Sequence, residues 1–208
     1  PASGEKIFYS SVAYLQSTDD TSRLDEFRDK GDYEGLLQAA KEYYDGNGIN
    51  EQYTFASPLQ NKGDDLLIED KDFAVVYNNS VGGTYEVMLK YSEQEIRDHI
   101  TRYGTRLASD DIKEVAKDMV AEQFQAITKQ RIPVFEMPSG DILYAGYNRE
   151  TDTLDVGTVV NAGLVPNHQF PYDHDNSLES NLQSVHSELS HMEQYQEEEV
   201  EYSGGMHR

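Results

Sequence analysis

The sequence predicts an α+β fold with a mainly antiparallel sheet, packed amphipathic helices and an acidic C-terminal helix. Two β-hairpins are expected, with Val- and Tyr-rich strands at 73–77 and 84–91 and a second pair at 142–147 and 153–160. A long amphipathic helix is expected at about 109–130. The order of strand, helices, hairpin, helices and hairpin differs from the βαβ repeats of a parallel sheet, so the strands should pair antiparallel.

The first part of the chain should add a strand, a helix and a short second strand. The first strand is expected at 6–15. Apolar residues then recur at helical spacing over 33–44, and the Asp-Gly-Asn-Gly run at 45–48 should end that helix. A short strand is expected at 53–58. Gly82 and Gly83 belong to a hairpin loop, because a phosphate-binding loop needs a Gly-Lys-Ser/Thr run before a helix.

Two helices should follow the first hairpin. Ser92 and Glu95 have the spacing of a capping box, which predicts a helix start, and Gly104 predicts the end of that helix. The longer helix after it is the simplest candidate for a core helix that lies on the sheet. After the second hairpin, residues 161–172 contain two prolines and are expected to form a loop.

The last predicted helix, from Ser177 to about 196, carries a narrow apolar stripe with Asn176 as its expected N-cap. The spacing of the stripe is four, three, four and three residues, which is typical of a coiled-coil seam or of a helix docked in a groove. Two interpretations remain open: the helix packs on its own domain, or it forms an oligomer or docking seam that could make a homodimer. The residues of this stripe are Leu178, Leu182, Val185, Leu189 and Met192.

Two parts of the chain are expected on these grounds. Residues 1–172 should form an α+β globular domain, and residues 173–208 an acidic C-terminal helix followed by a flexible tail. The tail includes the acidic run 197–201 and the Ser-Gly-Gly sequence at 203–205.

The strongest signal in the sequence is its negative charge. Asp and Glu number 39 against 17 Lys and Arg, which gives a formal net charge of −22. Residues 1–149 hold 27 acids and 16 bases, whereas residues 150–208 hold 12 acids and one base. Such a chain should repel nucleic acids and anionic membranes and attract basic surfaces. High solubility or an acid-rich proteome would also explain the charge, but a proteome-wide bias would spread it across the chain.

Several function classes find no support in the sequence. The absence of cysteine rules out disulfides, cysteine-ligated zinc and thiol catalysis. No run of about 18 apolar residues predicts a membrane span, and residues 1–10 lack the pattern of a signal peptide, so a cytoplasmic location is expected. No catalytic motif is found, and neither catalytic residues nor a cofactor are expected.

The acidic region also contains histidines, whose side chains can bind metal ions. Asp173, His174 and Asp175 with nearby His168 have suitable ligand atoms, but their spacing matches no known site. An EF-hand is excluded because Leu178 occupies the position that needs glycine. No metal is therefore expected.

The function that the charge favours is an acidic protein-binding inhibitor without direct nucleic-acid binding. Glu and Asp one helical turn apart are separated by about 5–6 Å, a spacing comparable to that of phosphates along a strand. The protein is therefore expected to act as a DNA mimic that blocks a basic nucleic-acid-binding, restriction or nuclease protein. The residues expected to bind this partner are Glu150, Asp152, Asp155, Asp173, Asp175, Glu179, Glu188 and Glu193.

Three alternatives remain open at this point. An immunity protein or a chaperone for a basic partner would bind one protein and be indifferent to DNA. An enzyme of an unrecognised class would show a pocket lined by a few perturbed groups. An assembly protein would use the apolar stripe of the last helix to oligomerise.

Overall fold

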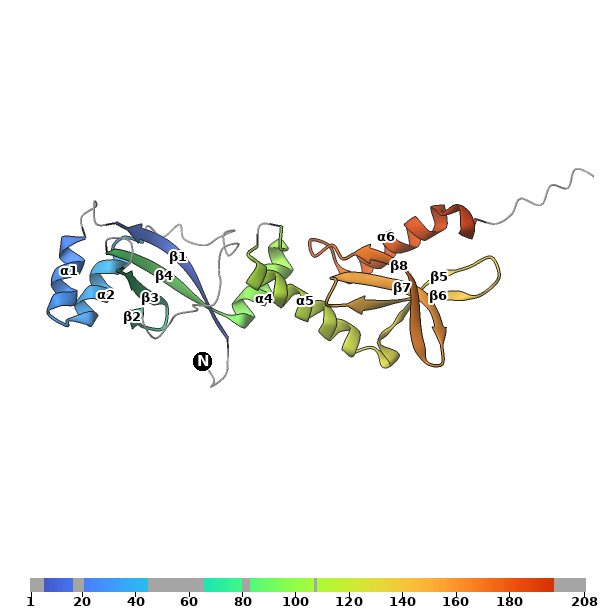
Figure 1. Cartoon of the computed structure of the whole chain (residues 1–208), viewed down its shortest axis with the longest axis horizontal. Coiled ribbons are helices and arrows are strands. Elements are labelled where there is room, and N and C mark those ends of the chain that lie inside the picture. The colour runs from blue at the N-terminus through green and yellow to red at the C-terminus, as the bar shows by residue number, and fades with distance from the viewer. Residues whose placement is uncertain (1–5, 17–20, 45–65, 80–82, 107, 197–208) are drawn as a thin grey trace, which may run out of the picture. The chain divides into compact units, whose positions relative to one another are not determined.

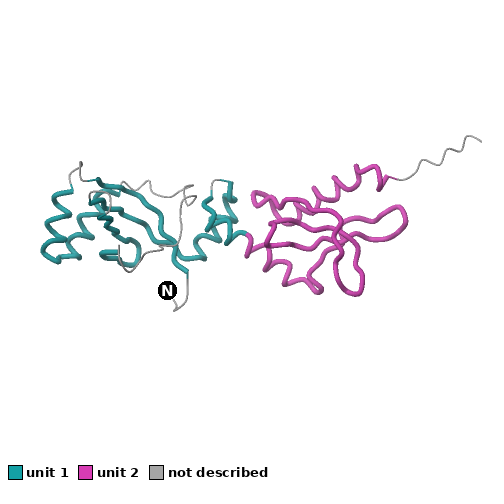
Figure 2. Tube along the Cα trace, viewed as in Figure 1, with its two compact units in different colours: residues 1–116 teal, residues 117–208 magenta. Residues whose placement is uncertain are grey.

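The computed structural model describes residues 6–16, 21–44, 66–79, 83–106 and 108–196 (Figure 1). These residues form two four-stranded antiparallel sheets together with helices, which confirms the α+β prediction. The chain divides into two compact units, Pro1–Ala116 and Lys117–Arg208 (Figure 2). Among the described residues, every helix is too short or too polar to cross a membrane.

The first unit is built on a sheet with the strand order β1-β4-β3-β2. Helices α1 and α2 contribute Leu24 and Leu36 to a core that they share with Val75, Tyr85 and Val87 of the sheet. The predicted first strand and first hairpin are confirmed. The elements are β1 Ile7–Leu15, α1 Ser22–Asp29, α2 Tyr33–Lys41, β2 Leu66–Glu69, β3 Phe73–Asn78 and β4 Thr84–Ser92.

Two further helices follow the first sheet, α4 Glu93–Tyr103 and α5 Asp110–Gln125. The capping box of Ser92 and Glu95 is present, and Gly104 ends α4 with a φ of 75°. Helix α5 ends five residues before the predicted end at 130, because Ile127 has an extended backbone and Lys129 and Gln130 adopt positive φ angles.

The second unit is built on a sheet with the strand order β5-β6-β7-β8. Its core combines Phe124 of α5, Leu143 and Leu154 of the sheet, and Val185 and Leu189 of the last helix. Each core therefore draws on helices as well as strands of its own unit. The elements are β5 Ile132–Glu136, β6 Ile142–Asn148, β7 Thr153–Val160, β8 Gly163–Pro171, α6 Leu178–His191 and the short 3-10 helix η3 Glu193–Tyr195.

The loop predicted at 161–172 is wrong, because most of it is strand β8. Proline is tolerated in edge strands and at β-bulges, where a missing N–H costs no ladder hydrogen bond. Strand β8 is an edge strand, and Pro166 lies opposite Gly157 beside a register shift in β7. Strand β5, another edge strand with a proline, had no counterpart in the sequence prediction.

Helix α6 lies against the sheet of its own unit (Figure 1). Its apolar stripe packs on the core of that unit. Val185 and Leu189 are buried, and Leu178, Leu182 and Met192 are partly buried against the same core. The predicted N-cap at Asn176 is wrong by one residue. Ser177 caps α6, since its side chain accepts a hydrogen bond from the Ser180 N–H.

Some predicted features lie outside the described residues. They are the turn at 45–48, the strand at 53–58, the acidic run at 197–201 and the segment 203–205. The predicted domain boundary between residues 172 and 173 falls inside the second compact unit.

Candidate functional site

The eight acids expected to bind a partner all belong to the second unit. They lie in the segment 150–196, which contains no lysine or arginine. The structure places them on the β6–β7 turn, on β7, on the β8–α6 connection, and on α6 and η3. Six are exposed, one is partly buried and one is buried.

Asp155 is the buried member of this set, with 9% of its surface exposed. Its carboxylate accepts hydrogen bonds from Thr153 Oγ1 at 2.6 Å, Gln169 Nε2 at 3.1 Å and Asn148 Nδ2 at 3.2 Å. These neutral donors come from three neighbouring strands and replace the water that the carboxylate loses on burial. Asp155 therefore links side chains of β6, β7 and β8, and it is the least accessible of the eight acids.

Asp152 is the partly buried member, and it joins the β6–β7 turn to the β8–α6 connection. Its carboxylate accepts a hydrogen bond from the Tyr147 hydroxyl at 2.6 Å and contacts His174 Nε2 at 2.8 and 2.9 Å. Its backbone carbonyl also accepts a hydrogen bond from the Tyr172 N–H at 3.0 Å. Asp152 thus holds two loops that carry other members of the set.

Two tyrosines beside Asp152 have raised pKa values, which favours their protonated form. Burial, followed by the hydrogen bond to Asp152, raises the pKa of Tyr147 well above its usual range. Burial and the charges of Asp152 and Asp173 raise the pKa of Tyr172 to about 12. Both hydroxyls therefore ionise at a higher pH than a free tyrosine does.

Asp173 shapes the connection between β8 and α6. Its carboxylate oxygens accept hydrogen bonds from the Asp175 N–H at 2.9 Å and from Asn176 Nδ2 at 2.7 Å. The side chain of Asn181, 6% exposed, accepts from the Asp173 N–H at 2.8 Å and donates to the Asp173 carbonyl at 2.9 Å and the Ser177 carbonyl at 2.9 Å. The role of Asn181 was not predicted from the sequence. Its position between Leu178 and Leu182 of the apolar stripe could have indicated that it lies on the buried side of α6.

The remaining exposed acids do not form one continuous row on α6. Glu179 and Glu188 are nine residues apart, and at about 100° per residue they project from opposite flanks of the helix. Glu150 lies on the β6–β7 turn, and Glu193 begins η3 after the end of α6. The exposed carboxylates are therefore spread over the β6–β7 turn, the β8–α6 connection, α6 and η3 instead of lining one stripe.

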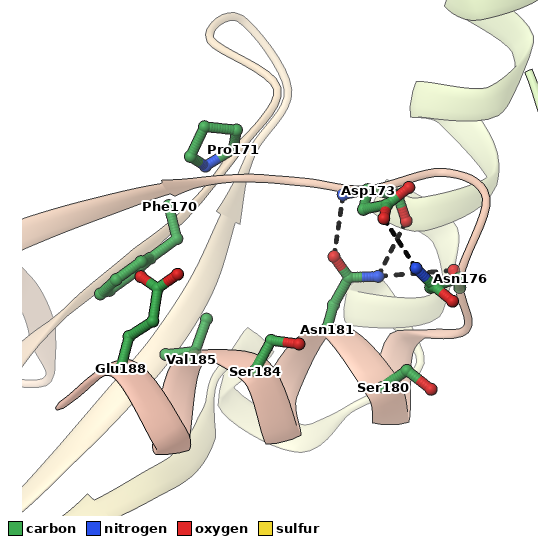
Figure 3. Close-up of a pocket in the computed structure, with 9 residues that line it drawn as sticks. All are labelled: Phe170, Pro171, Asp173, Asn176, Ser180, Asn181, Ser184, Val185 and Glu188. Atoms are coloured by element: carbon green, nitrogen blue, oxygen red, sulfur yellow. Dashed lines mark hydrogen bonds between the residues drawn. The ribbon is translucent and has the colours of Figure 1, made fainter. Parts of the chain in front are cut away.

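A pocket of about 210 Å³ opens between the C-terminal end of β8 and α6 (Figure 3). Asp173 and Glu188 bring two of the predicted acids to this pocket, and Ser184 and Asn181 add polar groups. Its apolar walls come from Phe170, Pro171 and Val185. This pocket could not be predicted from the sequence, because two of its walls belong to β8, whose residues were expected to form a loop.

The described residues contain no group of three His, Cys, Asp or Glu side chains that could hold a metal ion. His174, which lies in the histidine and aspartate cluster that was rejected as a metal site on its spacing, is hydrogen-bonded to Asp152. The arrangement can thus bind a cation or a hydrogen-bond donor through carboxylates beside an apolar wall.

Comparisons with protein-family models, curated proteins and solved structures found no match to the chain.

Proposed function

We propose that the second unit binds a basic surface of a partner protein. The observation that carries this proposal is the segment 150–196, which has eight carboxylates and no lysine or arginine. Arg149, the base that precedes the segment, is already engaged with Asp118 at an Nε–Oδ1 distance of 2.6 Å. Glu150, Glu179, Glu188 and Glu193 of this segment are exposed, so cations of another molecule can reach their carboxylates.

Electrostatics gives the expected character of this binding. Complementary charges accelerate encounter and set specificity, and their effect falls as salt screens them. The ordered loops around Asp152 and Asn181 keep the acids in defined positions, which reduces the entropy lost on binding. Binding should therefore be salt-sensitive and dependent on local acids instead of on the total charge.

In the finer version of the proposal, the partner's basic surface normally holds DNA and the protein acts as a DNA mimic that inhibits it. An immunity protein or a chaperone would use the same acids without competing with DNA. Because Glu179 and Glu188 lie on opposite flanks of α6, the mimicry version depends on the spread of carboxylates over several segments.

The proposal is tested by immobilising the full chain, passing lysate over it and eluting in salt steps from about 0.1 to 1 M, over which the Debye length falls from about 10 to 3 Å. Retained proteins are identified, purified and measured singly by surface plasmon resonance. The measurement is repeated with excess duplex DNA. Displacement by DNA would support mimicry, and indifference to DNA would support the immunity or chaperone version.

Two variants with the same net charge show whether the effect is local. The first neutralises four exposed acids of the second unit, Glu150→Gln, Glu179→Gln, Glu188→Gln and Glu193→Gln. The second neutralises four exposed acids of the first unit, Glu26→Gln, Glu34→Gln, Asp72→Asn and Asp110→Asn. The first variant should bind a retained basic protein at least about tenfold more weakly, and the second nearly as well as the parent. Equal losses in both, or no basic partner at all, would reject the proposal.

A further inference from the structure

We propose that the pocket between β8 and α6 receives an arginine side chain of the partner protein. This inference rests on the proposed function, since it names the group of the basic partner that the second unit recognises. The pocket is lined by residues of β8, of the β8–α6 connection and of α6, all within the second unit.

The size of the pocket fits one side chain better than a separate ligand. Its volume of about 210 Å³ lies below the range of about 300–1,000 Å³ that is usual for small-molecule sites. A cavity of about 150 Å³ is enough to hold a benzene molecule. The pocket therefore has room for the planar end of one long side chain and part of its stem.

The polar groups of the pocket fall into two sets, one held in place by hydrogen bonds and one without them. Asp173, Asn176 and Asn181 are held by hydrogen bonds to one another and to the backbone. Within the described part of the chain, the Glu188 carboxylate and the Ser184 hydroxyl make no hydrogen bond or ion pair. Since these two residues are four apart on α6, they lie on the same side of the helix and can both accept hydrogen bonds from one entering cation.

The apolar wall favours arginine over lysine. Phe170 and Glu188 both line the pocket and are drawn at the same end of it, with Asp173 and Asn176 at the other end (Figure 3). A guanidinium group can stack on an aromatic ring while its fork of N–H donors meets a carboxylate. An ammonium group is more strongly hydrated and lacks the flat face, so it gains less from the same wall.

The test is an NMR titration of the full-length, ¹⁵N-labelled protein with three capped tripeptides, Gly-Arg-Gly, Gly-Lys-Gly and Gly-citrulline-Gly. Citrulline keeps the shape of arginine without its charge. An ionic strength of about 0.1 M limits the reach of distant acids to about 10 Å. The arginine peptide should shift the backbone amides of Phe170, Ser184 and Glu188, with lysine binding about two- to fivefold more weakly and citrulline weaker still.

Matched variants connect these shifts to the pocket. Glu188→Gln should weaken arginine-peptide binding about two- to fivefold, whereas Glu179→Gln, which removes an equal charge from the other flank of α6, should not. Ser184→Phe should fill the pocket and abolish the shifts, whereas Ser187→Phe on the outer face of α6 should leave them intact. Equal effects of the two glutamate variants, or shifts that survive Ser184→Phe in a folded protein, would overturn the inference.

The same variants separate this inference from the proposed function. If Glu188→Gln and Ser184→Phe leave binding of the purified basic partner unchanged while the fourfold acidic variant abolishes it, the pocket inference is wrong and the proposed function stands. If the partner binds the fourfold variant as well as the parent, the proposed function is wrong, whatever the tripeptides show.

Discussion

Gly157 of β7 lies where the backbone of β8 comes close. A Cβ atom added to it would overlap the Val165 carbonyl oxygen and lie 2.8 Å from the Pro166 Cα atom. Both obstacles are backbone, which cannot turn away as a flexible side chain could. We expect Gly157→Ala to lower the free energy of unfolding by about 3 kcal/mol, the upper end of the usual cost of overpacking, as measured by urea denaturation.

The control for this change is Gly163→Ala in the same hairpin. An added Cβ there would meet the Val160 carbonyl oxygen at 3.5 Å, which is ordinary van der Waals contact. This variant should keep the stability of the parent to within about 0.5 kcal/mol. If the two alanine variants are equally stable, the close approach at the bulge does not constrain residue 157.

Tyr147 predicts a pH dependence of stability. Its pKa is raised in the folded state by burial and by the bond to Asp152, so the folded protein keeps a proton that the unfolded chain releases above about pH 10. The unfolding free energy should therefore fall as pH rises past about 10, by up to about 1.4 kcal/mol per pH unit for each such tyrosine. In urea titrations between about pH 9 and 11.5, Tyr147→Phe should show a shallower decline than the parent. Parallel curves for the two proteins would contradict this assignment.

At this scale, the acids of the candidate site could be predicted from the sequence, but their environments could not. The eight acids were found by counting charges, because no structure is needed to see a segment without lysine or arginine. Their different environments could not be found in this way. The burial of Asp155 depends on Asn148 and Gln169, and the bond of Asp152 to His174 joins residues 22 positions apart, so both arise only when the strands pair.

At the scale of elements, the apolar stripe of α6 explains where this helix packs. Its spacing predicts either an internal packing face or an oligomer seam, and in the structure the stripe packs on the core of the second unit. Leu189 is fully buried there. Leu189→Ala should therefore lower the unfolding free energy by about 3 kcal/mol, independently of protein concentration, as measured by urea denaturation.

Two observations would contradict that expectation. A stability that rises with protein concentration in the parent, and no longer does so in Leu189→Ala, would mean that the stripe joins two copies. A fall in the mass measured by sedimentation on the same substitution would mean the same. Ser187→Ala, on the exposed face of α6, is the control and should change neither quantity.

The elements that the sequence predicted well are those with strong local signals. The hairpin of β3 and β4, the hairpin of β6 and β7 and the capping box of α4 follow from turn residues and spacing alone. Strands β5 and β8 contain prolines, whose cost in a strand depends on whether the strand lies at an edge. That position is a property of the whole sheet, so a local reading of the residues could not supply it.

At the scale of the whole molecule, the boundary of the acidic segment differs from the boundary between the two compact units. The sequence placed a boundary at residue 172, near the start of the acidic segment, whereas compactness places it between Ala116 and Lys117. Each sheet and each of the two core clusters lies within one of these units. Acidic composition therefore does not coincide with a separate structural unit, because α6 depends on the β5–β8 sheet to bury its stripe.

This arrangement predicts two separable unfolding events. Leu36 is fully buried in the core of the first unit and Leu189 in that of the second. If the units unfold independently, differential scanning calorimetry should resolve two transitions, with Leu36→Ala lowering one midpoint and Leu189→Ala the other, each by several degrees.

A fragment of residues 108–208 completes the test. It keeps all of α5, which a cut at Lys117 would break, and so retains Val120 and Phe124 of the second core. It should give the same amide NMR spectrum for β5 to α6 as the full chain and show the transition that Leu189→Ala lowers. A fragment of residues 1–172, cut at the boundary that the sequence suggested, should lose that transition because it lacks Val185 and Leu189. If 1–172 instead keeps both transitions, the acidic segment is a true appendage, and its carboxylates must be positioned by something other than the second core.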